Sequence, residues 1–158
     1  TGPTGVTGAT GASANTELVV LATEALHAID GSDNNIDSLL VWDSTDKETY
    51  NRVVGNAATQ DLDLYYQIML PDNFSSWASD AIKITTQVDG GQFDVSVKDT
   101  AGVEDKALAN DTTTGTITIV GADLGGTWTA GATFLIEFHC EVDDGDIVEI
   151  GKIVGYYD

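Results

Sequence analysis

Apolar and polar residues alternate over three long stretches of the chain, residues 62–70, 93–97 and 133–142. A period of two places every second side chain on one face, as in a β-strand with one face buried. In the last stretch the positions expected to face inward are Phe134, Ile136, Phe138, Cys140 and Val142, and those expected to face outward are Glu137, His139 and Glu141. The pattern predicts three strands that line a common hydrophobic core.

Shorter runs of apolar or β-branched residues predict more strands, and Gly, Asp and Asn residues separate them as turns. These further strands are expected at 18–21, 36–42, 48–54, 81–88, 116–120 and 147–157. Residues 22–29 fit either an extension of the first strand or a helical turn, and we favour the strand. The polar segment 99–114 is expected to form a long loop. Since no segment has a convincing helical period, residues 14–158 are predicted to form one all-β domain, an antiparallel jelly roll or β-sandwich.

Aromatic residues between these strands have two expected roles. Phe74 and Trp77 follow a Leu-Pro turn and are expected to fold back onto the core. Trp128 lies among small residues, in the segment Gly-Gly-Thr-Trp-Thr, a setting in which an indole ring can stack on a sugar. It can also serve as a core plug for the following strand, which the pattern favours. Trp128 is therefore the candidate ligand-facing aromatic, with a structural alternative.

A different pattern opens the chain. Glycine recurs at Gly2, Gly5, Gly8 and Gly11, and a hydroxyl residue closes each triplet within residues 1–13. Glycine is required at every third position where three polyproline-II chains crowd around one axis in a collagen triple helix. A flexible Gly/Ser/Thr linker is the alternative, but a linker needs no period of three. The repeat predicts a collagen-like stalk and, with it, a homotrimer.

These triplets resemble the collagen-like stalks of bacterial surface proteins and bacteriophage fibres, which favour Gly-X-Thr. Residues 18–158 resemble the jelly-roll heads of phage fibre and virion-appended proteins. The residues that carry this second resemblance are Trp42-Asp43-Ser44-Thr45 followed by Glu48 and Tyr50, Leu70-Pro71 followed by Trp77, and the closing run 153–157. The resemblance implies a stalk that carries a β-sandwich head on a virion or cell surface.

The charge of the chain limits its partners. There are 26 acidic residues against 6 basic ones, which gives a net charge of −20. Nucleic acids and anionic membrane surfaces are recognised by basic patches, so the balance argues against both as partners. No apolar run is long enough to cross a membrane, and we expect no membrane insertion.

Aspartates gather in two turns, and clustered hard oxygen donors suit Ca²⁺. The candidate ligands are Asp30, Asp33 and Asp37 in the first turn, and Asp143, Asp144 and Asp146 in the second. The first turn does not have the spacing of an EF-hand, because Val41 stands where that loop needs a bidentate glutamate. Solvated turns in an acidic protein are the favoured alternative in both places. We therefore predict no required cofactor.

Sequence motifs for catalysis are missing. The chain has no phosphate-binding loop, no Gly-x-Ser-x-Gly elbow and no His-Glu-x-x-His motif. Its single cysteine, Cys140, excludes an intrachain disulfide. We expect a protein that is not an enzyme.

The function predicted from these features is a homotrimeric fibre or surface appendage, extracellular or on a virion, whose head mediates attachment or assembly. The alternative is a carbohydrate-binding module presented on a stalk, with a glycan as its partner. Four triplets are too few to hold three chains together, so we expect the head to set the trimer. The strand at 18–21 enters directly from the stalk, and its side chains are expected to pack between subunits.

Overall fold

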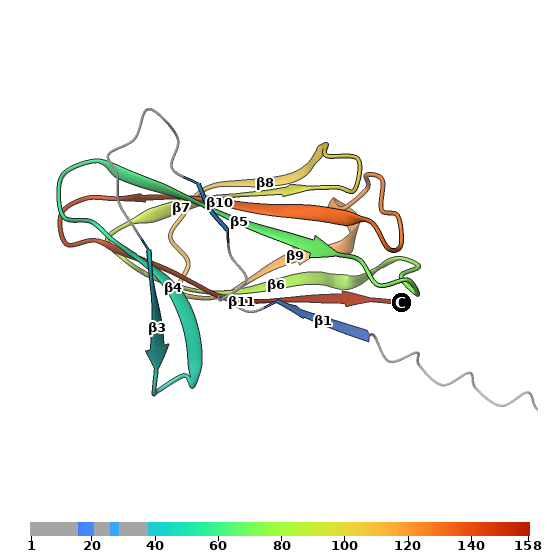
Figure 1. Cartoon of the computed structure of the whole chain (residues 1–158), viewed down its shortest axis with the longest axis horizontal. Helices are drawn as coiled ribbons and strands as arrows, with labels where there is room; N and C mark the ends of the chain where they lie inside the picture. Colours follow the sequence, from blue (N-terminus) through green and yellow to red (C-terminus); the bar gives the residue numbers. More distant parts are fainter. Residues whose placement is uncertain (1–15, 21–25, 29–37) are drawn as a thin grey trace, which may run out of the picture.

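The computed structural model describes residues 16–20 and 38–158, and the backbone of residues 26–28. The predicted stalk at 1–13 and the aspartate-rich turn at 30–37 lie outside the described residues. Figure 1 shows the described part as two layers of strands packed face to face.

Two sheets make up these layers, and all of their strand pairs are antiparallel. The six-stranded sheet contains β1 (Thr16–Val20), β3 (Ser38–Asp43), β4 (Glu48–Val54), β6 (Trp77–Asp89), β9 (Gly115–Val120) and β11 (Ile147–Tyr157). Its order is β3-β4-β11-β6-β9, with β1 also paired to β11. The five-stranded sheet contains β2 (Leu26–Ala28), β5 (Gln60–Met69), β7 (Gln92–Lys98), β8 (Glu104–Asp111) and β10 (Thr133–Val142). Its order is β2-β5-β10-β7-β8.

Helical structure in the described part is limited to the 3₁₀ turn η2 (Gly121–Asp123). None of the described residues belongs to a helix that is long and apolar enough to span a membrane. The antiparallel β-sandwich predicted from the alternation is therefore confirmed, and the predicted bounds 48–54, 133–142 and 147–157 match β4, β10 and β11.

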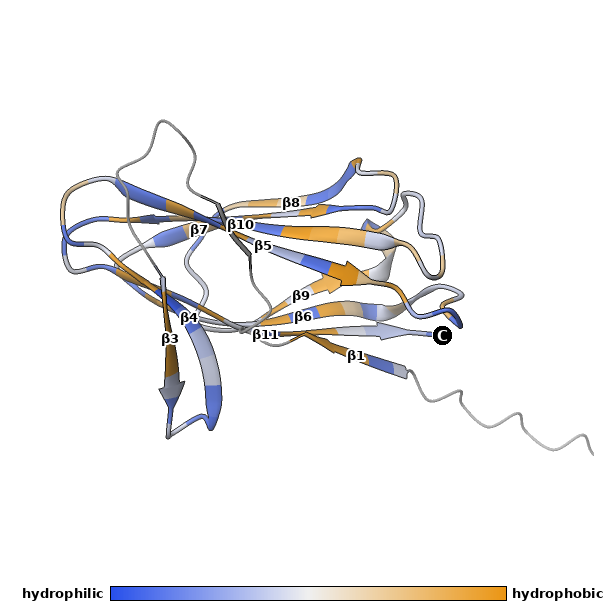
Figure 2. Cartoon of the chain, in the orientation of Figure 1, coloured by the Kyte–Doolittle hydropathy of each residue, from blue (hydrophilic) through white to orange (hydrophobic). Residues whose placement is uncertain are grey.

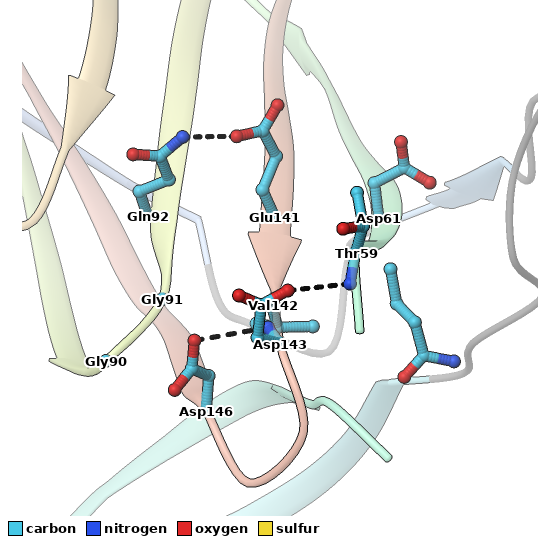
Figure 3. A pocket seen from close by; sticks show the side chains of 10 residues that line it. Thr59, Asp61, Gly90, Gly91, Gln92, Glu141, Val142, Asp143 and Asp146 are labelled. Carbon is cyan, nitrogen blue, oxygen red and sulfur yellow. Dashed lines mark hydrogen bonds between the residues drawn. The ribbon is translucent and has the colours of Figure 1, made fainter. Parts of the chain in front are cut away.

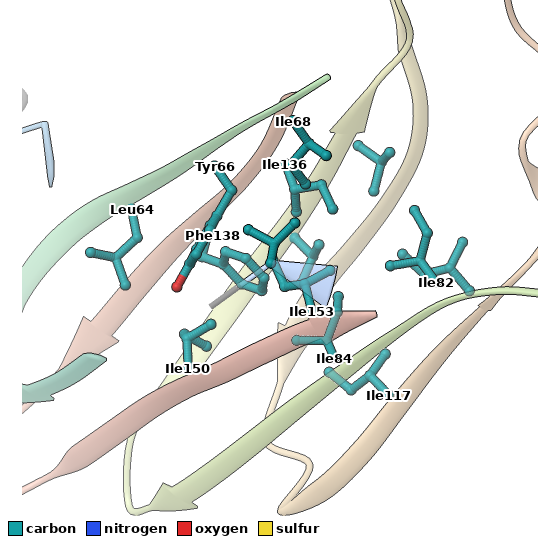
Figure 4. Close-up of a cluster of buried hydrophobic side chains, with 14 of the residues drawn as sticks. Leu64, Tyr66, Ile68, Ile82, Ile84, Ile117, Ile136, Phe138, Ile150 and Ile153 are labelled. Carbon is teal, nitrogen blue, oxygen red and sulfur yellow. The ribbon is translucent and has the colours of Figure 1, made fainter. Parts of the chain in front are cut away.

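The core lies between the two sheets, and the alternating stretches of the sequence supply much of it. All five inward positions predicted for β10 are buried. Phe138 on β10 and Tyr66 on β5 lie together in the core (Figure 4). Their rings pack edge-on, with centroids 5.7 Å apart. Phe93 on β7 completes this aromatic group, 6.2 Å from Phe138. The three longest alternating stretches thus meet side by side in one layer of the core.

Two predictions about strand extent are wrong. The segment 99–114, predicted to be a loop, contains β8, which pairs with β7 at the edge of its sheet. An edge strand is held by backbone hydrogen bonds on one side and buries few side chains, so it shows no clear apolar pattern. In β8 only Leu108 packs against the core cluster. The strand expected from residue 81 begins earlier, at Trp77.

The opening strand also departs from expectation. β1 pairs along the last residues of β11, and its Val20 is only 7% exposed within the core of its own domain. Leu18 packs against the same cluster. The expectation that this strand packs between subunits is wrong for Val20, which is buried within its own chain; for the partly buried Leu18 it stays a prediction.

Candidate functional site

The outer face of the five-stranded sheet carries a dense set of polar side chains. Strand pairing aligns them, together with the apolar Leu135, in rows that cross β5, β10 and β7: Asp63, His139 and Asp94; Tyr65, Glu137 and Ser96; Gln67, Leu135 and Lys98. We call these residues the polar face. They come from segments far apart in the sequence, and the sheet register alone brings them together.

His139 lies in the middle of the first row, surrounded by carboxylates. Its Nδ1 is 2.6 Å from Oδ1 of Asp63, a residue only 8% exposed, and its Nε2 is 3.8 Å from Asp61 and 3.6 Å from Glu141. Burial of the ring by itself would lower the pKa of His139. The hydrogen bond and charge of Asp63, together with the charges of Asp61 and Glu141, outweigh it and raise the pKa above its ordinary value of 6.5.

Tyr65 borders this row and is half-buried. Its hydroxyl donates a hydrogen bond to Oδ2 of Asp63 at 3.3 Å, so Asp63 joins the phenol to the imidazole. Burial, followed by the hydrogen bond and negative charge of Glu137 and Asp63, raises the pKa of Tyr65 above its ordinary value. The phenol is protonated at neutral pH, as it would be at its ordinary pKa, and its proton is directed at Asp63.

Lys98 marks the other side of the polar face. Its Nζ donates a hydrogen bond to Glu137 at 2.7 Å, and the Ser96 hydroxyl donates one to Glu104 at 2.8 Å. Two shallow depressions meet at Lys98. One has a volume of about 280 Å³ and extends past Ser96, Glu137 and His139, and the other has a volume of about 350 Å³ and extends past Gln67, Thr100 and Leu135. Lys98 lines both depressions, and we call the two together the groove.

This groove has the chemistry to hold a polyhydroxylated ligand. Carboxylates accept hydrogen bonds, whereas the Lys98 ammonium and the His139 imidazole donate them. The hydroxyls of a ligand can therefore find both acceptors and donors in the groove. The Tyr65 ring supplies an apolar surface with a polar tip beside these groups. Concave sites with a few convergent polar groups are the usual form of small-ligand sites.

Trp128 lies elsewhere, in the loop between η2 and β10. It is half-buried and packs edge-on against Trp77 and Phe134, with ring centroids 5.1 and 5.3 Å away. Its Nε1 donates a hydrogen bond to Oδ2 of Asp105 at 3.1 Å. This placement favours the core-plug alternative that the sequence also allowed.

Two aspartates hold the loop around Trp128 in place. Asp99 accepts backbone hydrogen bonds from Ala101 and Val103, both at 2.9 Å, and from Thr127 at 2.7 Å. Asp105 accepts one from the Gly126 backbone at 2.9 Å in addition to the Trp128 indole. Backbone donors lower the pKa of Asp99 below its ordinary value, with Thr127 the largest contributor. These carboxylates connect two loops at one end of the sandwich.

A second hollow, of about 360 Å³, lies at the opposite end and is lined by polar residues (Figure 3). Its carboxylates already have protein partners. Asp143 accepts a hydrogen bond from the Thr59 backbone at 2.6 Å, Asp146 accepts one from the Asp143 backbone at 3.1 Å, and Glu141 accepts one from the Gln92 amide. The hollow is thus built from turn-stabilising contacts.

The metal candidates have separate outcomes. Asp30, Asp33 and Asp37 lie outside the described residues, so a Ca²⁺ site there stays a prediction. Within residues 16–20 and 38–158, no group of three or more His, Cys, Asp or Glu side chains is arranged to hold a metal ion. Asp143, Asp144 and Asp146 are part of that range, and their proximity serves the turn.

Comparisons with known proteins support the fold. Family models and curated proteins give no match. Among solved structures, the chain is similar to TmCBM61, solved in complex with β-1,4-galactotriose, with 14% identity, a TM-score of 0.58 and coverage of 85% of this chain and 90% of that one. It is also similar to CBM86, a low-affinity xylan-binding module from the gut symbiont Roseburia intestinalis, with 5% identity, a TM-score of 0.51 and coverage of 90% and 96%.

A third similar structure is the enzymatically active domain of bacteriophage CBA120 tailspike protein 4, with 10% identity and a TM-score of 0.51. The match covers 85% of this chain but 20% of the tailspike chain. At these identities the likeness shows the fold alone, an antiparallel β-sandwich of the kind found in carbohydrate-binding modules.

Sequence reasoning located the parts of the polar face without recognising the site. Alternation assigned Glu137 and His139 outward, and the alternation of residues 62–70 places Tyr65 and Tyr66 on opposite faces of their strand. The missing signal was the pairing of β5 with β10, which places Asp63 against His139 across 76 residues of sequence. An outward aspartate, tyrosine and histidine on two alternating strands was the available clue.

Proposed function

We propose that this domain is a non-catalytic carbohydrate-binding module and that the groove along the polar face is its binding site. The observation that carries the proposal is the groove itself, which His139 and Lys98 line, with Tyr65 beside it in the same row of the polar face as Glu137. The similarity in fold to two carbohydrate-binding modules supports this alternative over a purely structural head.

The charge of the groove favours a neutral glycan. Glu137, Asp63 and Glu104 lie in or beside it, and Lys98 is already paired with Glu137. A carboxylated or sulfated sugar would meet like charges, which cost binding energy. Neutral hydroxyls can share the existing donors and acceptors without breaking the ion pairs.

The stalk belongs to the same proposal. If residues 1–13 form a triple helix, three heads are held on one extracellular or virion-surface appendage, and weak sites gain avidity from their proximity. A fibre whose head serves attachment remains the second candidate, supported by the glycine period at Gly2, Gly5, Gly8 and Gly11. Ligand contact at Trp128 also remains a prediction, although its packing favours the plug.

The test is titration of the full chain with soluble neutral polysaccharides, including β-1,4-galactan and xylan, and with an acidic one such as polygalacturonate. We expect a neutral glycan to bind and the acidic one not to bind. Tyr65→Ala and Lys98→Ala should each weaken binding at least about tenfold, which corresponds to ~1.4 kcal/mol. Trp128→Phe, which keeps an aromatic plug, should leave it unchanged.

Tyr156→Ala is the matched control. Tyr156 is also a half-buried tyrosine, but it lies on the six-stranded sheet, beneath the Lys83 ammonium at 5.2 Å from its ring centre. Equal losses in Tyr65→Ala and Tyr156→Ala would remove the polar face as the site. Absence of binding to every glycan tested would leave the fibre role as the better proposal.

A further inference from the structure

The β3–β4 hairpin carries an apolar surface with no role in the groove. Figure 1 shows this hairpin projecting beyond the two layers of the sandwich, and Figure 2 shows hydrophobic residues along β3. Leu39 is 62% exposed, Leu40 56% and Trp42 64%. Large apolar side chains grouped on an exposed element mark interaction sites more often than scattered ones do.

Both faces of β3 take part. Leu40 lies opposite Asn51, whose side chain reaches the buried Tyr66 hydroxyl, so Leu40 and Trp42 continue the core-side face of the sheet beyond the sandwich. Leu39 lies opposite Arg52, which pairs with Glu149 on the outer side. β3 is also the terminal strand in the order of its sheet, as far as the described strands show. We call β3 and β4 the arm.

The N-terminal segment joins the domain at the same sheet edge as the arm. β6 pairs with one edge of β11 along most of its length, so β1 and β4 both occupy the other edge. β4 pairs with residues 147–150 of β11, and β1 pairs with residues 153–157. β1 begins at Thr16, three residues after the last glycine triplet, and Thr16 pairs with Tyr157, at the other end of this edge from β4. The edge that carries the arm is therefore also the edge from which the chain continues toward the triplets.

We infer that the arm packs against a second copy of this chain, within the trimer that the triplets predict. This inference rests on the stalk of the proposed function. Each chain carries a net charge of −20, so contacts between copies are opposed by repulsion except where carboxylates are scarce. The run from Leu39 to Trp42 has no charged residue. The arm extends from the six-stranded sheet, which leaves the polar face of the other sheet open to ligand.

Sedimentation equilibrium of the full chain tests the arm. We expect the wild type to be a trimer, and Leu40→Asp to raise the concentration needed for assembly at least tenfold. Trp42→Ala should shift it in the same direction. Both side chains are largely exposed, so the β-sheet circular dichroism of the variants should match that of the wild type.

Met69→Asp is the matched control, because Met69 is 65% exposed on the five-stranded sheet and should leave the trimer intact. A trimer that persists unchanged in Leu40→Asp and Trp42→Ala would overturn the arm contact while keeping the stalk. A wild-type chain that stays monomeric would overturn both. Whatever the oligomeric state, titration with glycans tests binding in the groove separately.

Discussion

Strands β10 and β3 are both rich in large apolar side chains, but their environments are opposite. Phe134, Ile136 and Phe138 on β10 are buried, whereas Leu39, Leu40 and Trp42 on β3 are each more than half exposed. β10 lies in the middle of its sheet with the six-stranded sheet across from it. β3 extends past the sandwich, where no facing layer of the described chain covers it. Apolar character therefore predicts burial only where a second layer is present.

The two strands contribute to different properties of the protein, namely the stability of the domain and its surface for contact with other molecules. Side chains of β10 stabilise the domain itself, and those of β3 are available for another molecule. Substitutions on the two strands should differ in size and in the property they change. The following expectations run from the largest effect to the smallest.

Phe138→Ala should have the largest effect on stability. The side chain is fully buried against Tyr66 and Phe93, and truncating a core phenylalanine costs about 3–5 kcal/mol. Urea unfolding followed by circular dichroism would measure the change. A loss below ~1 kcal/mol would mean that this part of the core relaxes around the cavity.

Asp99→Ala should lower the melting temperature by releasing the loops near Trp128. The folded pKa of Asp99 is lowered, so its contribution is present above the ordinary carboxyl pKa of 3.8 and is lost as the pH falls through the lower folded value. The difference in melting temperature from wild type should therefore be full at neutral pH and shrink in strong acid. Asp144→Ala, at an exposed turn position, is the control. It should change neither the melting temperature nor the dependence of the melting temperature on pH.

His139→Gln should change how the stability of the domain depends on pH more than it changes the magnitude of that stability. The folded pKa of His139 is raised, so its contribution is fully present below the unfolded value near 6.5 and is lost as the pH rises through the folded value. Melting temperatures of wild type and variant should differ most in mild acid and converge in alkali. A constant difference across this range would show that the charge of the imidazole contributes nothing.

Leu39→Ala should have the smallest effect, about 0.5 kcal/mol or less on the free energy of unfolding of a subunit. The side chain is mostly exposed, so its truncation leaves no cavity. The free energy of unfolding should be measured for wild type and Leu39→Ala over a range of protein concentrations. If the arm packs on a neighbouring chain, the effect should grow where the trimer is populated, because assembly stabilises the folded subunit. A large loss in the dilute monomer would place Leu39 in the core after all.

Much of the fold could be predicted from alternation alone. The bounds of β4, β10 and β11 and the inward residues of β5, β7 and β10 follow from local sequence, because side chains of a strand point alternately to its two faces. The polar outward positions Glu137 and His139 were available in the same way. These features depend only on neighbours along the chain.

Other features were decided by the tertiary structure. β8 forms because β7 offers it an edge, Val20 is buried because β1 lies beneath the opposite sheet, and Trp128 packs where Trp77 and Phe134 meet. The groove exists because β10 pairs with β5 and β7 in one register, and a shift of one residue would turn its polar side chains into the core. The sequence by itself determined which faces are apolar. Which segments meet was decided by pairing between strands distant in sequence, since a side chain's burial and partners depend on what lies across from it.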